Sequence, residues 1–248
     1  MAVRFKRSYH DRKETVARRR KTILKVLILL LFFQIVFSLF AATIKMTSIS
    51  MEPEVSRGSV MIYSPFVYGF KINMLGLQLP QVRTPERGDL IVLTPPYMER
   101  RKGAFAVLNG VVKFFTFGKV NLNSISSESW NQGYLIKRIV GIPGDTIRMS
   151  DYKVSIKPEG SIYFLSEFEV IDKDYDIQIN NLPEFWTDDM PFSGNIDALT
   201  LEDDQYFVLG DNRMMSSDST DWGVLSRERI EGLILMKYWP LNQFTLYK

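Results

Sequence analysis

Two serines in the segment Ser-Ile-Ser-Met-Glu-Pro, residues 48–53, are spaced in a way that suits nucleophilic chemistry. If the segment is extended, Ser48 and Ser50 lie on the same face, and Pro53 stiffens the chain just beyond them. Ser50 could then act as a nucleophile, with the Ser48 hydroxyl and the Ser50 backbone N–H holding a developing oxyanion. The alternative is an ordinary polar linker, which the spacing alone does not exclude.

The composition narrows the choice of a base for such a nucleophile. The 248 residues include no cysteine and a single histidine, His10, which lies in the basic N-terminal tail. A Ser/His/Asp triad and a thiol nucleophile are therefore excluded from the rest of the chain, and a catalytic zinc site has almost nothing to be built from. No metal or other cofactor is expected, and the remaining bases are lysine, a carboxylate or an amine.

Lys137 is a candidate base because it interrupts the apolar run Tyr-Leu-Ile-Lys-Arg-Ile-Val, residues 134–140. On a strand, Lys137 and Arg138 point to opposite faces, so at least one of them is expected to face a packed interior. A lysine with an ordinary pKa of about 10.4 is protonated at neutral pH, but burial lowers the pKa and lets the amine accept a serine proton. The alternative is a solvated lysine on an edge strand.

The elements that would position these residues are mostly short strands. Runs rich in β-branched and aromatic residues, bounded by Gly, Pro and Asp turns, predict strands over 60–63, 90–93, 134–140, 146–149, 154–156, 163–165, 206–209 and 233–238. No stretch beyond residue 45 sustains a helical period over four turns. The sequence therefore predicts a mostly β domain over residues 45–248, with antiparallel sheets or an open barrel.

Two stretches of this domain look inserted, residues 97–133 and residues 166–204. The apolar part of the first stretch is interpreted as an ordinary strand or hairpin. Its mixture of basic and aromatic residues also suits shallow insertion of Phe114, Phe115 and Phe117 into a membrane interface, which is the less favoured hypothesis. The second is acidic and aromatic, and we interpret it as a surface excursion.

The N-terminal part of the chain predicts a membrane anchor. Residues 1–21 form a basic tail with nine Lys/Arg and two acidic residues. Residues 22–44 then carry one charge, Lys25, and are long enough to cross a bilayer as a helix. The tail should stay cytoplasmic and contact anionic lipid, which places the later residues on the outer face of the plasma or inner membrane. A cleaved signal peptide is the alternative.

Because the excess of basic over acidic residues is confined to this tail, no nucleic-acid partner is expected. A span of six residues reaches at most about 20 Å, so Ser50 cannot lie far from the lipid if the span ends at Ile44.

Four boxes resemble those of bacterial type I signal peptidases, the leader peptidases. Residues 48–53 are similar to S-x-S-M-x-P, 87–92 (RGDLIV) to R-G-D-[IV]-V-V, 134–145 (YLIKRIVGIPGD) to Y-[IV]-K-R-V-[IV]-G-x-P-G-D, and 210–219 (GDNRMMSSDS) to G-D-N-x-x-x-S-x-D-S. Each box alone is moderately specific, whereas four in this order behind a candidate span are strongly so. The resemblance covers most of residues 22–240.

By position, the resemblance implies the catalytic roles. Ser50 matches the nucleophile, Lys137 the general base, and Ser48 the hydroxyl that stabilises the oxyanion together with the Ser50 amide. Ser216 matches the serine that orients the lysine, and Asp218 belongs to the same supporting box.

The resemblance also implies structural features. Arg138 and Asp211 match an ion pair that joins two boxes, and the implied fold is an all-β assembly of two antiparallel sheets. The substrate-binding residues are inferred mainly from closeness in sequence to the reactive atoms; they are Met46, Ile49, Met51 and Ile136.

Four positions depart from the family pattern. Thr220 stands where an arginine is usual, so an ion pair between that arginine and Asp218 is absent. Ile49 replaces a frequent glycine, and Glu54-Val55 replaces Thr-Leu; Ile49 and Glu54 are expected to alter the substrate cleft.

The expected function is a single-pass, membrane-anchored serine endopeptidase that cleaves signal peptides from exported preproteins with a Ser/Lys dyad. Its partners would be secretory preproteins and the phospholipid membrane. Two alternatives stay open: a specialised protease of the same family that matures one secreted or conjugative protein, and a catalytically inactive, membrane-tethered peptide-binding domain. Self-cleaving SOS repressors share the Ser/Lys chemistry, but they lack a span and carry a DNA-binding domain, so they do not fit.

Overall fold

The computed structural model describes residues 9–69, 71–72, 77–78, 81–98, 133–180 and 194–247. The chain divides into two units, residues 1–40 and residues 41–248. Most of the predicted insertion at 97–133 lies outside the described residues, and so does the hypothesis about Phe114, Phe115 and Phe117.

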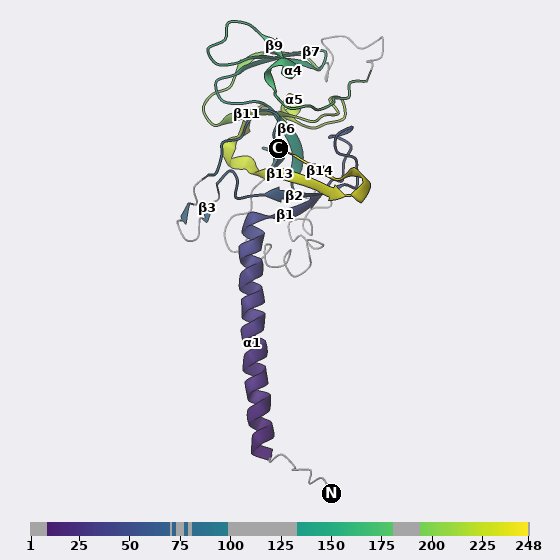
Figure 1. Ribbon diagram of the computed structural model, residues 1–248. Helices are drawn as coiled ribbons and strands as arrows, with labels where there is room; N and C mark the ends of the chain where they lie inside the picture. The colour runs from purple at the N-terminus through teal and green to yellow at the C-terminus, as the bar shows by residue number, and fades with distance from the viewer. Residues whose placement is uncertain are drawn as a thin grey trace. The chain divides into compact units, whose positions relative to one another are not determined.

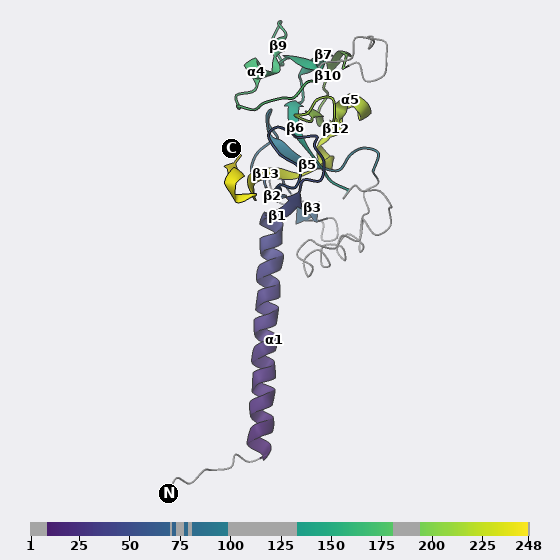
Figure 2. The same ribbon diagram turned by 90° about the vertical axis from the view of Figure 1, so that its right-hand side faces the viewer.

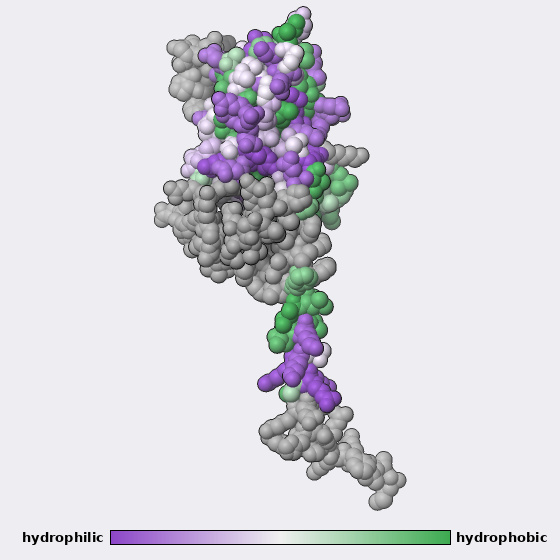
Figure 3. Space-filling model, turned by 90° about the vertical axis from the view of Figure 1, so that its left-hand side faces the viewer, coloured by the Kyte–Doolittle hydropathy of each residue, from purple (hydrophilic) through white to green (hydrophobic). Residues whose placement is uncertain are grey.

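The first unit contains the helix α1 (Tyr9–Phe40). Along its described part, the side chains change from hydrophilic to hydrophobic (Figure 3), where the basic tail gives way to the apolar run that begins at Thr22. Among the residues that the structure describes, no helix is both long and apolar enough to cross a membrane. The side chains of residues 33–40, which belong to the predicted span, lie outside the described residues.

The predicted span is too long at its C-terminal end. Helix α1 ends at Phe40, and the strand β1 (Ala42–Lys45) takes the last residues that were assigned to the span. β1 pairs antiparallel with β2 (Val60–Ser64), where Ile44 stands opposite Met61 and is only 8% exposed. A β-branched side chain that packs on a sheet in this way favours a strand over further helix.

An antiparallel sheet of eight strands forms the larger part of the second unit (Figure 1). Its order is β1-β2-β13-β5-β6-β11-β12, and β14 pairs with β13. Besides β1 and β2, its strands are β5 (Leu90–Leu93), β6 (Leu135–Gly141), β11 (Gln205–Leu209), β12 (Leu225–Ser226), β13 (Ile230–Trp239) and β14 (Thr245–Leu246).

A second antiparallel sheet lies at the end of this unit away from β1 and β2 (Figures 1 and 2). Its order is β10-β7-β8-β9, with β7 (Thr146–Ser150), β8 (Lys153–Lys157), β9 (Leu165–Ser166) and β10 (Ile196–Thr200). The remaining described elements are short: the pair β3 (Lys71–Ile72) and β4 (Leu77–Gln78), the helices α4 (Glu167–Val170) and α5 (Ser219–Trp222), and the 3-10 turns η1 (Arg227–Arg229) and η2 (Leu241–Gln243).

The central strands β5 and β6 are buried on both faces. On one face Leu90 packs in a cluster with Ile136, and on the other Ile91 packs in a cluster with Ile139. All of residues 90–93 are at most 2% exposed. Strands that are covered on both sides read as continuous apolar runs, which is why the sequence predicts them so directly. A third cluster joins the second sheet to the ends of β6 and β11.

The predicted mostly β architecture of antiparallel sheets is confirmed. The interpretation of residues 166–204 as a surface excursion is wrong for their described part, because Ile171 and Tyr175 are buried in the third cluster and β10 belongs to the second sheet. From residue 171 to 176, buried or half-buried side chains alternate with exposed aspartates. This period-two pattern is the signal in the sequence that predicts an extended, half-buried segment.

Candidate active site

Ser50 lies in a loop between β1 and β2 that is closed at its base. The Met46 N–H donates to the Ser59 carbonyl and the Gly58 N–H donates to the Met46 carbonyl, each at 2.8 Å. Within the loop, Met51 is fully buried and Ser50 is only 5% exposed. The loop therefore presents the Ser50 hydroxyl from an anchored backbone.

Lys137 lies in the middle of β6, opposite Ile91 of β5, and is 2% exposed. Its Nζ is 2.9 Å from the Oγ of Ser50 and 2.9 Å from the Oγ of Ser216. Burial lowers the pKa of Lys137 from 10.5 to about 8. The charges of three aspartates oppose this shift; they are Asp218, Asp211 and Asp221. With such a pKa, a substantial fraction of the amine is neutral at mildly alkaline pH and can accept a proton.

Ser216 is carried by the loop that follows β11, and Gly210 lets this loop pass close to Ser50. A Cβ on Gly210 would lie 2.2 Å from the Ser216 Oγ and 2.4 Å from the Ser50 carbonyl oxygen. The buried carboxylate of Asp218 accepts a hydrogen bond from the Gly210 N–H at 2.9 Å. Asp218 thus fixes the start of the loop that brings Ser216 to the lysine.

Thr220 replaces the missing arginine as a partner of Asp218. Its N–H and its hydroxyl donate to one carboxylate oxygen of Asp218, at 3.1 and 2.9 Å. The other carboxylate oxygen accepts the hydrogen bond from the Gly210 N–H. The departure from the family pattern therefore removes an ion pair but leaves both oxygens of Asp218 hydrogen-bonded.

The Ser48 hydroxyl and the Ser50 backbone N–H lie close to the candidate nucleophile. The two serine Oγ atoms are 3.1 Å apart, and Ser48 is exposed. Within the described residues, the Ser50 N–H has no hydrogen-bond acceptor. The Ser48 hydroxyl and the Ser50 N–H are thus the groups near the nucleophile that could bind a developing negative charge.

Arg138 faces the opposite side of β6 and forms a buried ion pair with Asp211. The guanidinium donates to both carboxylate oxygens, at 2.8 and 2.7 Å, and to the Gly88 carbonyl at 3.0 Å. It also stacks 4.0 Å from the centre of the Tyr175 ring. Burial opposes the charge, but the hydrogen bonds and the charge of Asp211 outweigh it and raise the pKa of Arg138. The pair joins β6 to the segment that follows β11.

Most of the inferred substrate-binding set lies in the core, and its role in substrate binding stays a prediction. Met46, Met51 and Ile136 are 4%, 0% and 4% exposed and belong to one core cluster. Their side chains fill the space between β1, β5 and β6, so they do not line an open cleft. Of the four residues, only Ile49 is partly exposed and has side-chain surface for a substrate.

Three residues that contact this region carried no predicted role. Asn212 hydrogen-bonds to the main chain of the Ser50 loop, and Arg213 forms a buried ion pair of 2.6 Å with Glu167. Asn212 lies inside residues 210–219, one of the four segments that resemble the family pattern. Its position could therefore be singled out from the sequence, but its role could not. The pairing of Arg213 with Glu167, 46 residues away, has no local signal in the sequence.

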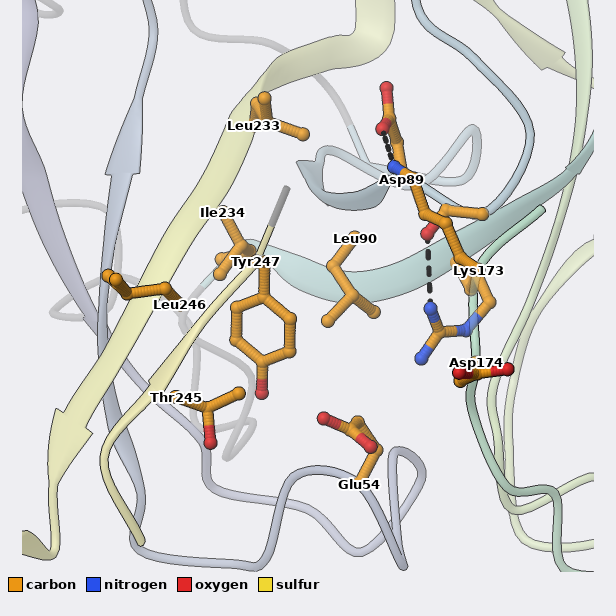
Figure 4. A pocket seen from close by; sticks show the side chains of 12 residues that line it. Glu54, Asp89, Leu90, Lys173, Asp174, Leu233, Ile234, Thr245, Leu246 and Tyr247 are labelled. Carbon is orange, nitrogen blue, oxygen red and sulfur yellow. Dashed lines mark hydrogen bonds and ion pairs between the residues drawn. The ribbon is translucent and has the colours of Figure 1, made fainter. Parts of the chain in front are cut away.

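A cavity of about 400 Å³ lies on the Arg138 side of β6, away from Lys137. Glu54, Arg138 and Tyr247 are among its lining residues, and in Figure 4 the Glu54 carboxylate and the Tyr247 hydroxyl point toward each other. Neither Ser50 nor Lys137 lines this cavity. The expectation that Glu54 alters the substrate cleft therefore stays a prediction. In the described part of the chain, no three His, Cys, Asp or Glu side chains are grouped so that they could hold a metal ion.

Comparison with known proteins gives the same family as the sequence motifs. The family described as signal peptidase, peptidase S26, matches residues 19–239. A probable signal peptidase I-2 from Synechocystis is 26% identical, with 80% of this chain and 63% of that protein aligned. A signal peptidase I from Streptococcus pneumoniae is 26% identical, with 55% of this chain and 76% of that protein aligned.

Among solved structures, a signal peptidase I from Enterococcus faecalis is 22% identical and covers 61% of this chain and 97% of that chain, with a TM-score of 0.31. The assignment rests on the family match, which extends from within α1 to the end of β13. The chain therefore belongs to the type I signal peptidases of bacteria.

Proposed function

We propose that this protein is a membrane-anchored serine endopeptidase that removes signal peptides from exported preproteins. The observation that carries the proposal is the 2.9 Å separation between the Lys137 Nζ and the Ser50 Oγ, at a site where burial lowers the pKa of the lysine to about 8. Membership of the signal peptidase family supports the substrate class.

In the proposed mechanism, neutral Lys137 takes the hydroxyl proton of Ser50 as its oxygen attacks the scissile carbonyl. The Ser48 hydroxyl and the Ser50 N–H stabilise the tetrahedral oxyanion, and the protonated lysine returns the proton to the leaving amine. The same lysine then activates a water molecule, which hydrolyses the acyl-enzyme and frees Ser50. Ser216 accepts a hydrogen bond from the Lys137 amine and keeps it aimed at Ser50.

The substrate would bind in an extended conformation beside the start of β6. β11 pairs with β6 only from Arg138 onward, so on this side Ile136 has no strand partner among the described residues. An added peptide strand could use this open edge and bring its scissile bond to Ser50. Small pockets would then favour Ala-x-Ala-like cleavage sites, as in the family that the motifs resemble.

The membrane anchor is the part of the proposal that rests on sequence. Residues 22–44 form an almost uncharged run behind a basic tail, and the part of this run up to Phe40 is helical. An anchor that ends with the helix at Phe40 would hold Ser50 within about 35 Å of the lipid, near the place where a signal peptide leaves the bilayer.

The test is cleavage of a preprotein by the full-length chain in detergent, with N-terminal sequencing of the product. Ser50→Ala and Lys137→Ala should each abolish cleavage, because one removes the nucleophile and the other the base. Ser48→Ala should reduce it by about 100-fold or more, as loss of an oxyanion donor does. Ser150→Ala and Lys153→Ala are matched controls on the exposed surface of the second sheet and should leave the rate unchanged.

Cleavage retained by Ser50→Ala or Lys137→Ala would refute the dyad. Covalent labelling of Ser50 by an acylating inhibitor separates an active protease from an inactive peptide-binding domain. A panel of preproteins then distinguishes general processing from maturation of a single protein.

A further inference from the structure

Asn212 holds the main chain on both sides of the Ser50 Cα. Its backbone N–H donates to the Ser50 carbonyl at 3.1 Å, and its side-chain Nδ2 donates to the Ile49 carbonyl at 3.4 Å. The Ile49 carbonyl also accepts from the Glu52 N–H at 3.1 Å. Asn212 itself is only 2% exposed, so these contacts are shielded from water.

The geometry of the peptide unit makes this contact relevant to the oxyanion. A trans peptide is planar, and its C=O and N–H point in opposite directions. Holding the Ile49 carbonyl toward Asn212 therefore directs the Ser50 N–H away from Asn212. The Ser50 N–H has no acceptor within the described residues, which leaves it available to a ligand. Because the Ser50 carbonyl is held as well, both peptide units around the nucleophile are fixed.

Asn212 is anchored through both of its neighbours. Asp211 is paired with Arg138 through two hydrogen bonds of 2.8 and 2.7 Å, and Arg213 is paired with Glu167 at 2.6 Å. All four charged side chains are at most 5% exposed.

The backbone on either side of Asn212 pairs with one extended residue. The Gln178 N–H donates to the Asp211 carbonyl at 2.8 Å, and the Arg213 N–H donates to the Gln178 carbonyl at 3.0 Å. The tripeptide 211–213 is thus a rigid support from which Asn212 reaches the nucleophile loop.

One atom of the Asn212 side chain destabilises the folded protein. Its Oδ1 is buried and has no hydrogen-bond partner among the described residues. A buried acceptor without a partner is unfavourable, so packing alone would favour an aliphatic side chain here. What asparagine provides that an aliphatic side chain lacks is the Nδ2 donor to Ile49.

We propose that Asn212 is a positioning residue that orients the Ser50 amide toward the oxyanion. The inference rests on the proposed Ser/Lys mechanism, in which that amide stabilises the tetrahedral intermediate. Asn212 acts through the peptide unit between Ile49 and Ser50. The oxyanion forms only after Ser50 attacks the substrate. Losing the Asn212 carboxamide should therefore reduce the stabilisation of the transition state and leave the affinity for the substrate unchanged.

The experiment compares Asn212→Leu with the wild-type full-length protein in detergent, using preprotein cleavage. Leucine has a similar size but no donor, and it leaves the backbone N–H in place. We expect kcat to fall by about 10- to 100-fold, toward the effect of losing an oxyanion donor, with KM changed by less than about twofold. The pH at half-maximal rate should not move, because no charge near Lys137 changes. Asn180→Leu, at an exposed asparagine, is the matched control and should match wild type.

A second readout tests the oxyanion directly. A peptide aldehyde forms a tetrahedral hemiacetal with Ser50, so Asn212→Leu should weaken its binding by the same factor as kcat. Asn212→Ala carries the same expectations if the leucine variant does not fold. Unchanged kcat, or a loss confined to KM, in the folded variant overturns the inference. The proposed function fails separately, if Ser50→Ala still cleaves; an inactive Ser50→Ala beside a fully active Asn212→Leu refutes only the role of Asn212.

Discussion

Lys137 and Arg138 are consecutive residues of β6 that are both buried, at 2% and 4% exposure, yet they face opposite sides of the strand. Arg138 is paired with a carboxylate through two hydrogen bonds, whereas Lys137 contacts two hydroxyls. The charged form of Arg138 is therefore stabilised overall, whereas for Lys137 burial outweighs the nearby aspartates and disfavours the charged form. This difference in partners separates a structural cation from a candidate base.

The first prediction is the pH dependence of cleavage. Only the neutral amine of Lys137 can accept the Ser50 proton, so kcat/KM should rise with pH around a midpoint near the lysine's pKa of about 8 and then level off. A pH–rate profile of preprotein cleavage measures this. Asp221→Asn should move the midpoint to lower pH, because the Asp221 charge raises the pKa of Lys137. Asp197→Asn, an exposed change in β10, should not. A rate independent of pH across the neutral and alkaline range contradicts the assignment.

The second prediction concerns the ion pair between Arg138 and Asp211. Asp211→Asn leaves a buried guanidinium without its counter-charge, so we expect the free energy of unfolding to fall by about 3–5 kcal/mol. Chemical denaturation of the full-length protein measures the change. Glu86→Gln is the control, because its 3.9 Å contact with Arg83 is largely exposed and should contribute less than about 1 kcal/mol. Equal effects of the two substitutions would show that burial of the pair is not decisive.

The third prediction uses the close approach at Gly210. In Gly210→Ala the new methyl group would meet the Ser216 Oγ and the Ser50 carbonyl oxygen at 2.2 and 2.4 Å. Since one of these atoms is main chain, the loop must shift and Ser216 must leave Lys137. We expect cleavage to fall by about 100-fold or more, because a misplacement of catalytic groups by about 1 Å can cost that much in rate.

Gly160→Ala is the matched control for this change. Gly160 has a positive φ of 78° but nothing within 4 Å of the added methyl group. It should lose about 1 kcal/mol of stability and keep its cleavage rate. An active Gly210→Ala would mean that the contact between Ser216 and Lys137 is dispensable.

The parts of the fold that could be predicted are those whose signal is local. Residues 90–93 and 134–140 show their burial as uninterrupted apolar runs, and turn residues mark their ends. Lys137 stands out for the same reason, since a charge inside such a run needs an explanation. The sequence does not predict the strand β1, because its residues extend the apolar run of α1. Its extended conformation follows from its pairing with β2.

What could not be predicted depends on contacts between distant residues. Whether Met51 lines a cleft or fills the core is decided by β5 and β6 packing against it, not by its closeness to Ser50. The pair of Arg213 with Glu167 likewise exists only after the segment 166–175 folds back on the main sheet. Family resemblance indicates which residues share a box, but the contacts of Asn212 and Thr220 follow from the fold.

The fourth prediction tests the role of Thr220 as a substitute for the missing arginine. Thr220→Val removes the hydroxyl that donates to Asp218 at 2.9 Å but keeps the backbone donor. We expect a loss of about 1 kcal/mol in stability and a modest fall in cleavage rate. Thr220→Ser keeps the hydroxyl and should stay close to wild type in both assays. A valine variant that equals the serine variant would show that Asp218 does not need this bond.

The fifth prediction is that Lys137 lowers stability at neutral pH. Its pKa falls from 10.5 to about 8 on folding, so between these values the unfolded chain binds more protons than the folded chain. Stability should therefore rise with pH through this window, by an amount that can reach about 3 kcal/mol. Lys137→Met removes the titrating group and should be more stable than wild type below the window, with a flatter pH dependence.

Chemical denaturation at a series of pH values compares these two chains. Lys153→Met, at an exposed position of β8, should keep the wild-type slope. If Lys137→Met were instead less stable at neutral pH, the surrounding aspartates would stabilise the charged amine by more than burial disfavours it, and the pKa of Lys137 would not be lowered on folding. A lysine stabilised in that way could not serve as the base for Ser50.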